Sequence, residues 1–183
     1  MLGAVLALAT GAHRRFGPAV VLTAAAASSF PDWDDLPSGV HRVWGHSFLV
    51  APFTGGLIGA LGYLVYLSLR GRRRPAATFS RHDLTVWMVL GVLVSLSHVL
   101  TDLAYSGRAF TAEWPVALLW PLSNRRWACP LVPWADRGMT LILGSSLAAA
   151  CVRPAEARVI SVFGVVAAAG YVVLWAAARV VRD

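Results

Sequence analysis

The stretch FLVAPFTGGLIGALGYLVYLSL, residues 48–69, carries no Asp, Glu, Lys or Arg. An α-helix rises about 1.5 Å per residue, so about 20 apolar residues cross the roughly 30 Å hydrocarbon core of a bilayer. Further runs of this kind lie on either side of it, at residues 16–31, 84–101, 138–152 and 159–178. The sequence therefore predicts an all-α integral membrane protein.

The composition favours the same fold class. Hydrophobic residues make up 57% of the 183 residues and charged residues only 14%, whereas a soluble domain carries about 25% charged residues. Such a chain has too few charges to cover a water-exposed surface, and its length is that of one compact unit. We expect a single membrane-embedded domain over residues 1–183, multi-pass in the cell (inner) membrane, with about five to six transmembrane or interfacial helices.

Glycine, proline and arginine divide the apolar runs. We expect a short apolar segment at residues 1–12, and then helices near 18–30, 47–69, 84–104, 138–152 and 158–179. Residues 105–137 hold four Pro and four Trp, which predicts an interfacial or re-entrant segment instead of a clean span.

The basic residues exclude several kinds of chemistry. All 16 are Arg, and the formal net charge is +7. Without Lys, the chain has no Schiff-base nucleophile, Ser–Lys dyad or P-loop lysine. Arg clusters in a membrane protein set topology and contact anionic lipid, so we expect membrane lipid and no nucleic acid as a partner. Cys129 and Cys151 form no CxxC motif, which argues against a disulfide scaffold or a thiolate zinc site.

The distribution of Arg predicts an orientation. The positive-inside rule places the loop at residues 70–81 in the cytoplasm, and alternation then places 13–15, 70–83 and 153–158 inside, with 31–46, 103–137 and the C-terminus outside. These inner segments hold nine Arg against two acidic residues, whereas the outer segments hold seven of each. Six of the eight Trp also fall on the outer side, as expected for an interfacial belt.

In this topology three segments bring His and Asp side chains to the outer face. The first follows the helix at 18–30, the second precedes the helix at 47–69, and the third is the end of the helix at 84–104. In the third, His98 and Asp102 are spaced i, i+4 and share one helix face. The complete set is Asp32, Asp34, Asp35, His41, His46, His98 and Asp102.

Imidazole and carboxylate groups at this density suit zinc, manganese or a similar divalent cation, and they are usual at hydrolytic metal sites. We predict one or two ions. Arg42 is predicted to bind an anionic group of the substrate, and Asp35 to support the ligands or act as a general base. The predicted metal ligands are Asp32, Asp34, His41, His46, His98 and Asp102.

Each feature also has a simpler structural interpretation. His98 and Asp102 are equally consistent with a hydrogen-bonded pair within one helix, and the Asp cluster at 32–35 with a helix cap and a solvated loop. Ser47 is typical of an N-cap. The glycines at positions 55, 56, 59 and 62 are typical of close helix packing. The coincidence of three clusters on one face favours the metal site.

The ordered motifs resemble the YdjM-type family of membrane-bound, metal-dependent hydrolases. They are Asp32-Trp33-Asp34, His41-Arg42-x-x-x-His46-Ser47, His98-x-x-x-Asp102 and the stretch LLWPLS at 118–123. The resemblance covers roughly residues 1–138 and implies a hydrolase-like membrane domain whose His and Asp residues hold the metal. Some family members are described as binding the LexA repressor, but nothing in these residues supports that partner here.

The chain departs from the family pattern at two places. Family members carry a Thr-His pair about four residues before a glycine of the first helix; the matching glycine is Gly3, so that His would precede Met1. Either the natural start lies upstream or this protein lacks that ligand. Asp35 replaces a His that often follows Asp-x-Asp, and its harder oxygen favours manganese or magnesium, whereas the histidines favour a transition metal.

These observations predict a hydrolase that acts on a phosphate or ester bond at headgroup depth, in a lipid-like or phosphorylated substrate. Two other functions remain open. A non-catalytic scaffold or assembly protein would need no metal. A proton-coupled transporter would use His98 and Asp102 as a relay, but it requires ionisable residues nearer the bilayer midplane, and the inner halves of the helices hold none.

Overall fold

The computed structural model describes residues 1–34, 42–73, 78–106, 115–133 and 136–180. Within these ranges the chain is helical apart from connecting loops and one isolated β-bridge, so the predicted all-α fold class is confirmed. The helices are α1 (Leu2–Thr10), α2 (Ala12–Phe16), α3 (Pro18–Ser29), η1 (Phe30–Asp34), α5 (Val50–Arg73), α6 (Arg81–Ala104), α7 (Gly138–Val152), η2 (Pro154–Glu156) and α8 (Ala157–Val180).

Three of the described helices are long and apolar enough to cross a membrane. The spans are Val50–Gly71, Arg81–Ala104 and Pro154–Ala178, of 22, 24 and 25 residues. Helix α7 is also apolar but shorter than these three spans, and α1 and α3 are shorter than α7. The expected segment at 1–12 is broken at Gly11, whose φ of 79° ends α1 in the left-handed conformation that glycine adopts without strain.

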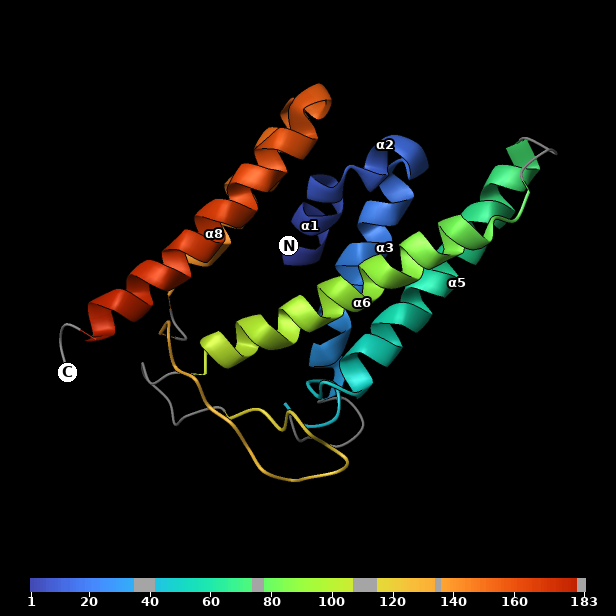
Figure 1. Cartoon of the computed structure of the whole chain (residues 1–183). Coiled ribbons are helices and arrows are strands. Elements are labelled where there is room, and N and C mark those ends of the chain that lie inside the picture. The colour runs from blue at the N-terminus through green and yellow to red at the C-terminus, as the bar shows by residue number, and fades with distance from the viewer. Residues whose placement is uncertain (35–41, 74–77, 107–114, 134–135, 181–183) are drawn as a thin grey trace.

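Helices α5 and α6 lie side by side (Figure 1), and small residues bring their backbones into contact where they cross. A Cβ atom added at Gly55 would collide with the carbonyl oxygen of Gly91, and one added at Gly59 would collide with the carbonyl oxygen of Trp87. Because lipid tails are as apolar as the helices, such close packing is what holds transmembrane helices together. The expected role of these glycines in helix packing is confirmed.

The other helices complete the bundle around this pair. At its centre Trp87, Tyr63 and Phe16 are buried, and the Phe16 and Trp87 rings meet edge-on with centroids 5.5 Å apart. On the other side α1 packs between α3 and α8, with Gly3 against the backbone of Ala24. The α7–α8 hairpin is closed by Ser146, whose hydroxyl donates a hydrogen bond to the Ile160 carbonyl.

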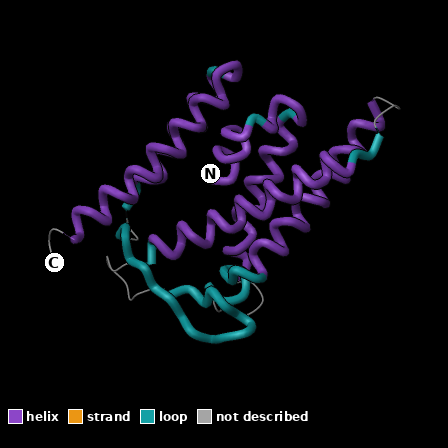
Figure 2. The backbone as a smooth tube through the Cα atoms, in the orientation of Figure 1, coloured by secondary structure: helices purple, strands orange, loops and turns teal. Residues whose placement is uncertain are grey.

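The loops gather at two opposite ends of the bundle (Figures 1 and 2). At one end Arg15 pairs with Asp83 at 2.5 Å, and Arg14 donates a hydrogen bond to the Ala155 carbonyl. These contacts unite the three segments that the Arg count assigned to one side, and we call this the Arg end. The opposite end holds η1, residues 42–49 and residues 115–133.

Replacing Gly59 by Leu is expected to separate α5 from α6, since overpacking of this kind costs about 1–3 kcal/mol. The detergent-purified Gly59→Leu protein should unfold several degrees below the wild type in a thermal scan. Gly170→Leu is the matched control, because nothing lies within 4 Å of a Cβ added at Gly170. Equal midpoints for the two variants would contradict the close-packing interpretation.

Candidate metal centre

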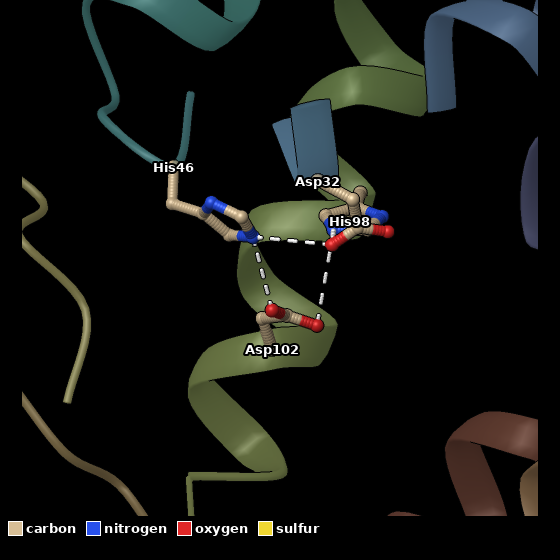
Figure 3. A group of neighbouring side chains, drawn as sticks. All are labelled: Asp32, His46, His98 and Asp102. Atoms are coloured by element: carbon tan, nitrogen blue, oxygen red, sulfur yellow. Dashed lines mark ion pairs between the residues drawn. The ribbon is translucent and has the colours of Figure 1, made fainter. Parts of the chain in front are cut away.

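Four side chains from three segments meet at the end opposite the Arg end (Figure 3). Asp32 comes from η1, His46 from the loop before α5, and His98 and Asp102 from the last turns of α6. One ligand atom from each lies within 4.8 Å of the others. The sequence therefore predicted four of the residues that the fold brings together, including the i, i+4 pair on α6.

The separations between the four side chains suit a small cation. Nε2 of His46 lies 3.0 Å from Asp102 and 3.6 Å from Asp32. Nε2 of His98 lies 3.2 Å from Asp32 and 3.8 Å from Asp102. Zinc bonds of about 2.0–2.2 Å place tetrahedral ligand atoms roughly 3.3–3.6 Å apart. The observed separations scatter around that range, although the two histidines approach different oxygens of Asp102, and one atom of each residue lies within 4.8 Å of the others, so the side chains would have to close around a cation.

Asp34 lies outside this group of four and holds the loop that carries His46. Its buried carboxylate accepts hydrogen bonds from the backbone N–H groups of Arg42 at 3.2 Å, Val43 at 2.9 Å and Gly45 at 3.3 Å. It also lies 3.1 Å from Nδ1 of His46. The sequence predicted Asp34 as a direct ligand; here its carboxylate contacts Nδ1 of His46, on the other side of the ring from Asp32 and Asp102, and its role as a ligand stays a prediction.

The contact with Asp34 fixes the orientation of the His46 ring. A carboxylate accepts hydrogen bonds, so Nδ1 donates to Asp34, and Nε2 points at Asp32 and Asp102. A cation bound at Nε2 would replace the proton on that nitrogen and leave the contact between Nδ1 and Asp34 in place. A carboxylate behind the ring in this way is the usual companion of a metal-binding histidine. His46 itself is fully buried, which leaves the ring no alternative orientation toward water.

The carboxylates dominate the electrostatics of the centre. Burial lowers the pKa of His46, but hydrogen bonds to Asp102, Asp32 and Asp34 outweigh burial and raise that pKa to about 10. For Asp32 the effects have the opposite sign. Burial raises the pKa of this carboxyl, but hydrogen bonds from His46 and His98 outweigh burial and bring the pKa well below its ordinary value. Three carboxylates, those of Asp32, Asp34 and Asp102, meet the single guanidinium of Arg42 here, and this excess of acidic groups suits a divalent cation that displaces the proton from His46.

Arg42 lies beside the centre with its side chain only 2% exposed. A terminal nitrogen of its guanidinium is 3.0 Å from Asp102. Its φ of 63° is uncommon for a residue other than glycine, and the hydrogen bond from its N–H to Asp34 holds it there. In this conformation the guanidinium forms an ion pair with Asp102 and so holds the Asp102 carboxylate in position beside His46 and His98.

Residues 115–133 form hydrogen bonds with the loop that carries Arg42 and His46. The Arg42 carbonyl accepts a hydrogen bond from Ala117 at 3.1 Å, and the Leu118 carbonyl accepts one from Phe48 at 2.9 Å. The Ser47 hydroxyl donates to the Trp120 carbonyl at 2.5 Å. Apart from the Ser47 hydroxyl, backbone groups make these contacts, so side-chain patterns could not have revealed the partners in residues 115–133. Ser47 also acts as the predicted N-cap of α5: its Oγ accepts a hydrogen bond from the Leu49 N–H at 3.1 Å, and its carbonyl accepts one from the Ala51 N–H at 2.9 Å.

His41 and Asp35 lie outside the described residues. His13 and His82 lie at the Arg end, on α2 and at the start of α6.

With this geometry in place, the comparison with family models is decisive. The model of the YdjM inner membrane protein family matches residues 1–181. The chain belongs to this family. No curated protein and no solved structure matches it. Membership establishes a membrane protein, in agreement with the apolar helices.

Replacing His98 by Ala is expected to abolish tight binding of zinc or manganese, because it removes one of four converging ligand atoms. Elemental analysis of the detergent-purified protein, after loading and desalting, measures this directly. The wild type should retain at least one equivalent and the variant less than one tenth of that. The matched control is His82→Ala, in the first turn of the same helix, which should retain wild-type content. Equal metal in both variants would refute the site.

Proposed function

We propose that this YdjM-family protein is a metal-dependent hydrolase that cleaves a phosphate or ester bond of a lipid-like substrate at the membrane interface. The observation that carries the proposal is the convergence of Asp32, His46, His98 and Asp102 within 4.8 Å at the end of an apolar 24-residue helix. Ionisable groups at such a position are costly unless they are paired or bind a ligand, and this donor set is common at hydrolytic zinc and manganese sites.

The exposure of the ligands supports access for a substrate from one side. His46 is fully buried, whereas the Asp32 side chain is 50% exposed. A molecule would therefore approach over η1, where Phe30 and Trp33 stack with ring centroids 5.8 Å apart. Trp33 is 57% exposed, and an exposed Trp beside a polar site suits the interface between headgroups and hydrocarbon.

Each residue has a defined part in the proposed reaction. A bound zinc or manganese ion would act as a Lewis acid and lower the pKa of a coordinated water. Asp34 orients His46, and Arg42 orients Asp102 while keeping a positive charge near the site where an anionic group would bind. We further propose His41 as an additional ligand and Asp35 as a supporting group or general base.

We also propose that the chain is multi-pass and that the centre faces the outer side of the membrane. The segments rich in Arg lie together at the opposite end of the bundle, and the positive-inside rule assigns that end to the cytoplasm. Bound metal would then be exchanged with the outer compartment.

Loading the protein with zinc or manganese is expected to yield hydrolysis of lipid phosphates or carboxylic esters in mixed micelles. Product analysis by mass spectrometry should give a rate at least about 100-fold lower for His46→Ala, with His82→Ala at the wild-type rate. A metal-loaded wild type that cleaves neither bond class, in phospholipids or in polyprenyl phosphates, would contradict the enzyme and favour a scaffold.

The two native cysteines report the orientation, because both are exposed and they lie at opposite ends of the bundle. In sealed right-side-out vesicles, a membrane-impermeant maleimide should label Cys129, near the centre, and spare Cys151, at the end of α7. Cys129→Ser and Cys151→Ser variants identify the labelled site, and permeabilised vesicles should label both. Labelling of Cys151 alone would place the centre on the cytoplasmic side.

A further inference from the structure

A second feature lies at the Arg end, away from the candidate metal centre. A cavity of about 440 Å³ opens between the α1–α2 turn and the first half of α6. One wall consists of Val86, Val89, Leu90 and Leu93, whose i, i+3, i+4, i+7 spacing places them on one helix face. Val89 and Leu93 are half exposed, whereas Leu90 and Phe16 are buried and form the floor.

The mouth of this cavity is polar and positively charged. Arg15, His82, Thr10 and Thr85 line it beside the apolar wall. The Arg158 side chain lies over Gly11 at the same turn. Among the described residues, Asp83 pairs there with a terminal nitrogen of Arg15. A guanidinium has five N–H donors, so Arg15 retains donors for an anion, and its side chain is 58% exposed.

The dimensions of the groove match one leaflet of a bilayer. Along α6, the lining residues run from His82 to Leu93, which at about 1.5 Å per residue corresponds to roughly 16 Å. One leaflet contributes about half of the roughly 30 Å hydrocarbon core. The groove thus begins among the Arg side chains and ends near the middle of α6. A lipid with its phosphate at the mouth would have an acyl chain that ends at the same depth.

We propose that this groove is a binding site for an anionic phospholipid, with the phosphate at Arg15 and His82 and one acyl chain along Val86, Val89 and Leu93. The apolar floor excludes a purely polar ligand, and the excess of Arg at the mouth favours an anionic over a zwitterionic headgroup. Because α2 and α6 form opposite walls, the bound lipid fills the gap between them. The proposal is independent of the hydrolase activity, since it involves neither the metal ligands nor their end of the bundle.

Lipid retention by the full-length chain tests the site. The protein is reconstituted in nanodiscs of equal parts phosphatidylglycerol and phosphatidylcholine, transferred to detergent, and its bound lipid is measured by native mass spectrometry. We expect the wild type to retain phosphatidylglycerol at least about fivefold over phosphatidylcholine. Val89→Trp, which fills the groove from its exposed rim, should lower that retention at least threefold, as should Arg15→Gln combined with His82→Gln.

Matched controls exclude nonspecific effects. Leu174→Trp places the same bulk on the exposed face of α8, and Arg126→Gln removes a charge at the opposite end; both should retain lipid like the wild type. Equal loss in Leu174→Trp and Val89→Trp, or equal retention of the two lipids by the wild type, would overturn the proposal. So would displacement of the lipid by glycerol phosphate alone, which would indicate an anion site without a groove for the tail.

Discussion

The buried carboxylate of Asp34 is the group on which the candidate metal centre depends. It accepts hydrogen bonds from three backbone N–H groups of the loop at residues 42–45 and contacts the imidazole of His46. A buried charge without such partners would be strongly destabilising. The same contacts therefore stabilise the carboxylate and fix the loop, and they direct one nitrogen of His46 at the ligands from η1 and α6.

Helix packing provides the second half of the geometry. The backbone contact between Gly55 and Gly91 sets how closely α5 and α6 approach, and it places the loop that enters α5 at the level of the last turns of α6. His98 and Asp102 are presented there by a continuous helix, and residues 115–133 close the loop from the other side. The precision of the centre thus derives from interactions that involve none of its ligand atoms.

The sequence predicted those features that depend on the residues of a single helix or on the chemical type of a side chain. Apolar runs located the long helices, the Arg count identified the segments that share one end, and the i, i+4 spacing of His98 and Asp102 predicted their common face. It could not separate Asp32 from Asp34, because the direction of each carboxylate depends on the 3₁₀ turn at η1 and on a loop folded around it. The roles of Ala117 and Trp120 were equally hidden, since their contacts use backbone groups that every residue carries.

The order of the ligands along the chain has a consequence for biogenesis. Asp32 and His46 are synthesised well before α6, and the bracing residues 115–133 come after it. The four ligand atoms therefore meet only once α5 and α6 have both inserted and packed against each other. A cation bound there would connect three separate segments of the chain, so its uptake would follow the packing of α5 against α6 and would stabilise the assembled fold.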